Sequence, residues 1–278
     1  MQIKYCCTSW GSDYDKPELF FDKVLLAGYE GVEINFPSLS DTPAKLYFKL
    51  IAEAFNTNPD FTFVAQHILP VQGISIDTYI LNVKNNLLEL SALQPSFINA
   101  HTGSDYFSFD DNCRVIEAAL KISQQTGIPI FHETHRGRFS FHAASLLPYL
   151  KKFPEMELVG DFSHFCTVSE SMLQGQEEIL AQIIPHVSHI HARIGHEQGP
   201  QVNDPFAPEW ESHFSLYEKW WQAIIDFKKQ KKAKSIAITP EFGPAPYMPS
   251  MPFTKEPLSN QWDINYKMML RLKETLQK

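Results

Sequence analysis

The sequence has few cysteines and no pattern that would use them in a zinc ribbon or a disulfide framework. Its four cysteines are Cys6, Cys7, Cys113 and Cys166; none form a C-x-x-C pair, and two of them are adjacent. Small disulfide-rich folds and zinc ribbons need regularly spaced cysteine pairs. We therefore exclude both classes and expect a reducing, cytoplasmic environment.

The sequence also lacks an excess of positive charge and any long apolar run. Its formal net charge is -8 and its pI is near 5.8, so it does not supply the cationic field that binds a phosphate backbone. A membrane-spanning helix needs about 18 consecutive apolar residues, and the N-terminus lacks a charged segment followed by an apolar one. We expect neither a nucleic-acid partner nor a membrane partner.

A glycine-rich phosphate loop is missing after the first expected strand, where the turn reads CCTSWGSDYDKPE. That loop is typical of doubly wound open sheets, so its absence disfavours the main rival fold. The chain has 278 residues, 44% of them hydrophobic and 20% charged. This length is close to the roughly 250 residues of a single α/β barrel. We expect one domain over residues 1–278.

Short β-rich runs alternate with longer segments of helical periodicity along the whole chain. Eight strands are expected at residues 3–7, 32–36, 62–68, 97–101, 129–135, 158–162, 187–194 and 236–241. Helices are expected near 16–27, 43–56, 77–92, 110–126, 142–152, 176–184, 211–231 and 260–276. This alternation predicts a single (β/α)8 TIM barrel, with long ordered loops at 195–210 and 243–260 as walls of the site.

Polar residues follow six consecutive expected strands, at the ends where barrel enzymes place their chemistry. These ends read QH at 66–67, NAH at 99–101, HETH at 132–135, DFSH at 161–164, HIHAR at 189–193 and PEFG at 240–243. A single one of these residues would be explained by helix capping or by a backbone hydrogen bond. Several carboxylates and histidines converging on one rim instead indicate a divalent cation.

The series HETHRGR, GDFSHF, HIHAR and TPEFG resembles the xylose-isomerase-like barrels, which include sugar epimerases, inosose dehydratases and, more distantly, apurinic endonucleases. In the epimerase branch one divalent ion is held by four strand ends. The resemblance assigns these metal ligands to Glu133, Asp161, His191 and Glu241. It leaves the ion as Mn, Zn, Co or Mg.

The residues around the expected ligands depart from the epimerase pattern. The expected second glutamate and the later arginine are missing, and the nearest arginine after His191 is Arg193. Arg136 and Arg138 are either structural rim residues or anion-binding groups. The predicted substrate-binding residues are His67, His101, His135, Arg136, His164 and Arg193. Trp10, Phe36, Phe107 and Trp210 are candidates for stacking on a sugar or for plain packing.

Several functions are compatible with this pattern. The first is a sugar or sugar-phosphate isomerase or epimerase, in which Glu133 and Glu241 are the catalytic acid and base around an enediolate. The same proton abstraction would start an inosose dehydratase reaction on a cyclic polyol. A multi-zinc phosphodiesterase would use His67, His101 and His164 as extra ligands, and a barrel without catalysis would bind no metal. The expected partner is a small carbohydrate or polyol, and a homo-oligomer remains open.

Overall fold

The computed structural model describes residues 1–276. Its strands are β1 (Gln2–Thr8), β2 (Gly31–Asn35), β3 (Thr62–Ile68), β4 (Phe97–His101), β5 (Ile130–Glu133), β6 (Glu157–Gly160), β7 (Val187–Ala192) and β8 (Ser235–Pro240). Its main helices are α1 (Pro17–Leu26), α2 (Thr42–Thr57), α3 (Ile76–Ala92), α4 (Phe109–Thr126), α5 (Ala143–Lys152), α6 (Phe162–Val168), α7 (Glu177–Ile183), α8 (Glu211–Gln230) and α9 (Gln261–Thr275).

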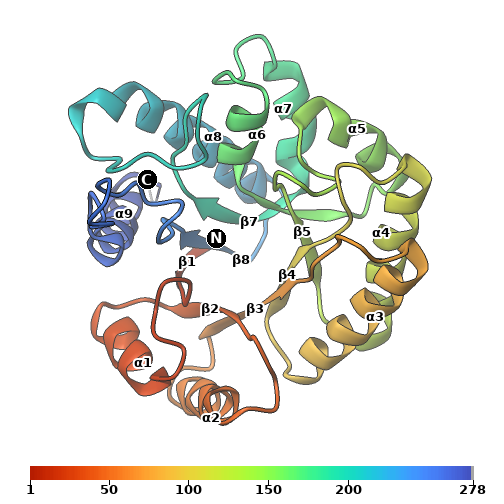
Figure 1. Cartoon of the computed structure of the whole chain (residues 1–278), viewed down its shortest axis with the longest axis horizontal. Helices are drawn as coiled ribbons and strands as arrows, with labels where there is room; N and C mark the ends of the chain where they lie inside the picture. The colour runs from red at the N-terminus through yellow and green to blue at the C-terminus, as the bar shows by residue number, and fades with distance from the viewer. Residues whose placement is uncertain (277–278) are drawn as a thin grey trace.

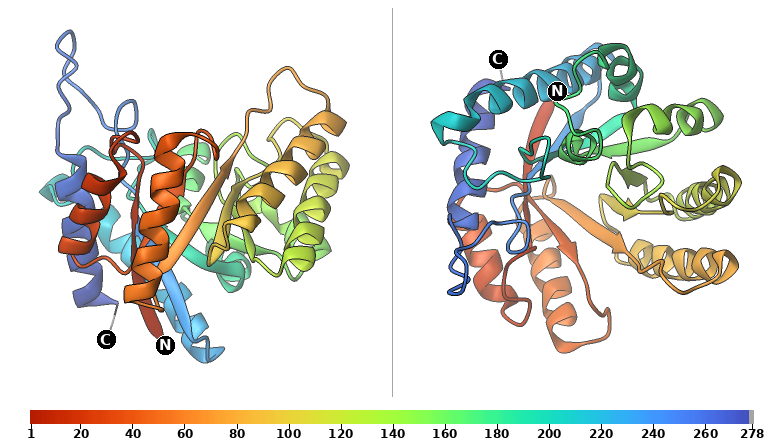
Figure 2. Two further views of the ribbon diagram at one scale, coloured as in Figure 1. Left: turned by 90° about the horizontal axis from the view of Figure 1, so that it is seen from below. Right: turned by 45° about the horizontal axis from the view of Figure 1, so that its top comes forward.

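The strands form one closed barrel in sequence order, and β8 closes the ring against β1 with parallel pairing. The helices surround this barrel (Figure 1). The segment between β8 and α9, drawn in blue, projects beyond the barrel on the side opposite the N-terminus (Figure 2). No helix within residues 1–276 is long and apolar enough to cross a membrane. The predicted TIM barrel is confirmed.

Local sequence signals explain where several helices begin and end. The side chain of Asp41 accepts a hydrogen bond of 2.7 Å from the backbone N–H of Ala44 and caps α2, in which Pro43 occupies the first turn. Helix α4 ends at Gly127, whose φ of 73° is the left-handed conformation that glycine adopts without strain. These caps give α2 a defined start and α4 a defined end.

The structure corrects the prediction around β6. The expected strand at 158–162 ends earlier, at Gly160, and the unpredicted helix α6 follows immediately. Asp161 is the N-cap of this helix: its Oδ1 accepts hydrogen bonds from the backbone N–H and the hydroxyl of Ser163, at 3.0 and 2.5 Å. The chain therefore turns at the end of the strand, which brings Asp161 and His164 to the same side.

The barrel interior is built in layers because alternate residues of each strand point inward. One layer is apolar and consists of Cys6, Val64, Phe97, Phe131, Val159 and Ala237. Two residues after each of these come the buried polar residues Thr8, Gln66, Asn99, Glu133, Asp161 and Thr239. The change from apolar to polar side chains thus occurs inside the barrel, below its C-terminal mouth.

Candidate metal centre

Four side chains from four successive strand ends meet at the mouth of the barrel. Ligand atoms of Glu133, Asp161, His191 and Glu241 all lie within 4.8 Å of one another. Each of the four residues is buried, with at most 5% of its surface exposed. Three carboxylates and an imidazole at this separation form a donor set suited to a borderline or hard divalent ion.

The surroundings of His191 show whether the four-residue set stabilises a positive charge. Its Nδ1 lies 2.9 Å from Oε2 of Glu241 and 3.6 Å from Oε2 of Glu133. This buried nitrogen makes no hydrogen bond of good geometry to any described residue. Burial alone would lower the pKa of His191, but Glu241, Glu33 and Glu133 raise it well above its usual range. The set therefore attracts a cation, and its residues fit a divalent ion.

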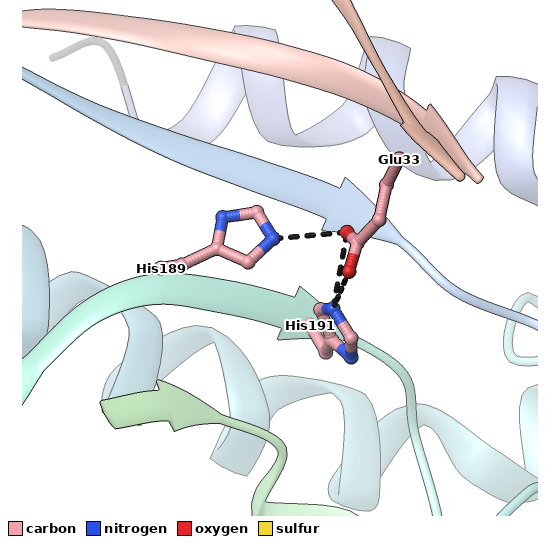
Figure 3. Close-up of side chains that lie close together, drawn as sticks. All are labelled: Glu33, His189 and His191. Carbon is pink, nitrogen blue, oxygen red and sulfur yellow. Dashed lines mark hydrogen bonds and ion pairs between the residues drawn. The ribbon is translucent and has the colours of Figure 1, made fainter. Parts of the chain in front are cut away.

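The opposite nitrogen of His191 belongs to a second, deeper cluster around Glu33 of β2 (Figure 3). Nε2 of His191 lies 3.0 Å from Oε1 of Glu33, and Nε2 of His189 lies 3.1 Å from Oε2. A ring proton donated to Glu33 fixes the orientation of His191 and directs Nδ1 towards the mouth.

Glu33 is fully buried and has enough donors to hold it as an anion. Besides the two histidines, it accepts hydrogen bonds from Gln66 at 3.0 Å, from Asn99 at 2.9 Å and from the hydroxyl of Thr239 at 2.6 Å. Burial alone would raise the pKa of Glu33, but the two histidines outweigh it and lower that pKa well below its usual range. This lower cluster is saturated and leaves no open ligand position.

Arg193 places a guanidinium directly beside the four-residue set. Its Nη2 forms an ion pair with Oδ2 of Asp161, and its Nη1 lies 3.6 Å from Oε2 of Glu241. The same guanidinium contacts Nε2 of His164 at 3.0 Å. Arg193 therefore offsets negative charge at Asp161 and Glu241 and makes no ion pair with Glu133 among the described residues.

A cavity of about 440 Å³ opens on this set and gives a small molecule access to it. Glu133, Glu241 and Arg193 line the cavity, together with His101 and His135. Its remaining wall is largely aromatic or apolar and includes Trp10, Tyr14, Pro37, Tyr47, Ile68 and Tyr247. A cavity lined by aromatic faces together with a few polar groups is typical of a binding site for a small molecule such as a carbohydrate.

No family model matches this chain, and no curated protein matches it either. Solved structures do match over nearly the whole chain. A xylose isomerase domain protein from Alicyclobacillus acidocaldarius is 12% identical, with a TM-score of 0.64 and coverage of 99% of this chain and 98% of its own. The chain has the fold of the xylose isomerase-like barrels.

Two further solved structures also match over nearly the whole chain. The IolI protein, described with a bound zinc atom, is 14% identical, with a TM-score of 0.63 and coverage of 99% and 100%. The probable 3-DHS dehydratase AsbF from Bacillus anthracis is 15% identical, with a TM-score of 0.59 and coverage of 97% and 98%. At these identities the similarity establishes the fold of this chain and not its reaction.

The other predicted site residues divide into those that line the cavity and those that do not. His101, His135 and Arg193 line the cavity, and Nε2 of His101 lies 2.6 Å from Oε2 of Glu133. His164 is fully buried behind Arg193, and the guanidinium of Arg136 lies 4.9 Å from the ring centroid of Tyr247.

His67 is not brought to the mouth of the barrel. It is fully buried, and its Nδ1 lies 2.6 Å from the side-chain oxygen of Asn86 on α3. It belongs to no cluster of metal-ligating side chains among the described residues. Of the four aromatic candidates, Trp10 lines the cavity, whereas Phe36, Phe107 and Trp210 pack against the hydrophobic core.

The two glutamates at the mouth differ in their electrostatic surroundings. Burial would raise the pKa of Glu133, but His101 and His191 outweigh it, so that this pKa is lowered. At Glu241 burial prevails over His191 and Arg193, and the pKa is raised. Glu241 is therefore the more basic of the two carboxylates.

The sequence analysis missed Glu33 and Thr239, although the other partners of Glu33 lie in the strand-end runs described there. A sequence signal for Glu33 was present in the strand GVEIN, where one charged residue stands between the apolar residues Val32 and Ile34. Such a residue points into the barrel, because its neighbours Val32 and Ile34 point to the helices. Its partner His191 lies 158 positions away in the sequence, so no local motif connects the two.

Proposed function

We propose that this protein is a metal-dependent sugar or sugar-phosphate isomerase or epimerase that moves a proton beside a carbonyl group. The observation that carries the proposal is the convergence of Glu133, Asp161, His191 and Glu241 at the end of a carbohydrate-sized cavity. These four residues would hold the ion. When bound, a divalent cation acts as a Lewis acid that makes hydrogens next to a carbonyl more acidic.

Glu241 is best assigned as the base of this reaction and Glu133 as the acid. Both line the cavity, so a bound substrate can reach both carboxylates. Glu241 has the raised pKa and is the stronger base, which favours it for proton abstraction. Glu133 accepts hydrogen bonds from His101 at 2.6 Å and Asn99 at 2.7 Å, and these hold its carboxylate in position.

The aromatic wall would exclude water and orient the substrate. Trp10 and Tyr247 pack edge to face, with ring centroids 4.9 Å apart, and both line the cavity. These aromatic faces fit the carbon face of a small carbohydrate or polyol. Water exclusion also protects an enediolate, because it strengthens the charge interactions around it.

A dehydratase acting on a cyclic polyol is the second candidate, since its reaction begins with the same proton abstraction. The fold shared with a probable dehydratase supports keeping this alternative. A multi-zinc phosphodiesterase receives less support, because only His101 of its three expected extra ligands joins a ligand cluster among residues 1–276, whereas His67 and His164 do not. The presence of all four proposed metal ligands at the mouth of the barrel also disfavours a barrel without catalysis.

Hydrogen exchange tests the proposal. We expect the protein, loaded with Mn²⁺ in heavy water, to exchange a carbon-bound hydrogen of one member of a panel of ketoses, inososes and their phosphates. Glu241→Gln keeps the size of the side chain and removes the base, so exchange should fall by roughly 10²- to 10⁴-fold. Glu197→Gln, outside the cavity and next to His213, is the matched control and should exchange at the parental rate.

The products separate the alternatives. Retention of substrate mass, apart from deuterium, identifies an isomerase or epimerase, and loss of one water identifies a dehydratase. A parent protein that cleaves abasic DNA and exchanges no carbon-bound hydrogen would overturn the proposal. Full exchange by a metal-loaded Glu241→Gln variant would remove Glu241 from the mechanism.

A further inference from the structure

The guanidinium of Arg193 is paired with two of the proposed metal ligands, Asp161 and Glu241, and would compete with a divalent ion for them. The following inference rests on the proposed function. We infer that Arg193 is the resident cation of the ligand set and that it gives up Asp161 when a divalent ion binds. Metal binding is then the exchange of one cation for another. The guanidinium is buried, with 2% of the residue exposed, so its charge is poorly screened by solvent.

The oxygens of Asp161 explain why the two cations compete. Oδ1 is committed to capping α6, because it accepts the backbone N–H and the hydroxyl of Ser163. Oδ2 is the remaining oxygen, and it is paired with Nη2 of Arg193. An ion that uses Asp161 as a ligand therefore meets the positive charge of the guanidinium at Oδ2, and the repulsion between the two cations favours displacement of Arg193.

The surroundings of Arg193 offer the displaced guanidinium a place to go. Its centre lies 4.8 Å from the ring centroid of Tyr247 and 5.9 Å from that of Trp10. All three residues line the cavity of about 440 Å³. A guanidinium moved towards these aromatic faces keeps favourable cation–π contacts and enters the space where a substrate would bind.

Arg138 provides the contrast within the same cavity. It also lines the cavity, but both of its Nη atoms donate to the carbonyl oxygen of Leu69, at 3.2 Å. It makes no ion pair among the described residues, so it does not compete for any of the proposed ligands. Removing its charge should leave metal affinity unchanged.

Isothermal titration of the metal-free protein with Mn²⁺ tests the exchange. Arg193→Met should bind Mn²⁺ more tightly than the parent by about tenfold or more, the size expected for loss of a close buried charge pair. Arg193→Gln, which retains a hydrogen-bond partner for Asp161, should show the same direction and covers the case in which Arg193→Met fails to fold. Arg138→Gln is the matched control and should bind like the parent.

A double-mutant cycle localises the effect to Asp161. In an Asp161→Ala background, Arg193→Gln should increase the affinity for Mn²⁺ far less than it does in the parent, because only the longer contact of Arg193 with Glu241 is then relieved. The metal-free Arg193→Gln protein should also melt at a lower temperature and gain more from saturating Mn²⁺ than the parent does.

The outcomes separate this inference from the metal centre itself. If the parent binds Mn²⁺ and both Arg193 variants bind it equally or more weakly, the metal centre stands and the exchange is wrong. If neither the parent nor the variants bind Mn²⁺, the proposed function and the exchange fail together.

Discussion

Two carboxylate clusters share the ring of His191, and they differ in how their charge is balanced. The lower cluster holds a single carboxylate, Glu33, which accepts from two histidines, two amides and a hydroxyl. The upper cluster holds three carboxylates and one guanidinium, and it opens on a cavity. A buried carboxylate saturated with donors is structural, whereas a carboxylate cluster short of donors requires a cation.

The largest effect expected from this comparison concerns stability without metal. Glu33→Ala leaves several buried donors unpaired and should lower the free energy of unfolding by about 3–5 kcal/mol. Glu241→Ala relieves repulsion among the upper carboxylates and should cost less than half as much. Urea denaturation of both metal-free variants measures the difference. Equal losses would show that the upper cluster is as well satisfied as the lower one.

The buried histidines His191 and His67 also differ in their electrostatic surroundings. Carboxylates surround His191 and raise its pKa, whereas His67 lies beside neutral Asn86, and burial lowers the pKa of His67 to about 4 from 6.5. A lowered pKa in the folded state gives a contribution to stability that is complete above pH 6.5 and is lost as the pH falls towards 4.

The His67 contribution can be isolated with a variant. His67→Gln retains a donor for Asn86 and removes the titrating ring, so it should reduce the acid-induced loss of unfolding free energy by roughly 3 kcal/mol between pH 6.5 and 4. Urea denaturation across this range measures the change. An unchanged pH dependence would show that His67 does not stay neutral in the folded protein.

The barrel was predictable from the sequence because its signals are local and repeated. Alternation of β-rich runs with helical periodicity located every strand to within a few residues. Helix α6 was not predicted, because it follows β6 without an intervening loop and its first residue lies inside the strand expected at 158–162. The cap by Asp161 that starts this helix became apparent only once the end of β6 was known.

The four proposed metal ligands were predictable from the sequence, but the residues that support and compete with them were not. The motifs containing Glu133, Asp161, His191 and Glu241 are local, and the barrel brings them together as expected. The support from Glu33 depends on a contact between β2 and β7, across the barrel. The pairing of Arg193 with Asp161 depends on the turn into α6. Both are consequences of packing, which no short motif encodes.

The central claim is that the four strand-end residues form one metal centre. Crystals grown with Mn²⁺ and measured for anomalous scattering test it most directly. The account predicts one strong peak within ligand distance of Glu133, Asp161, His191 and Glu241, at roughly 2.0–2.2 Å from the oxygens and the imidazole nitrogen. A fully Mn²⁺-loaded protein without a peak among these four residues, or with its peak at His101 and His135 alone, would contradict it.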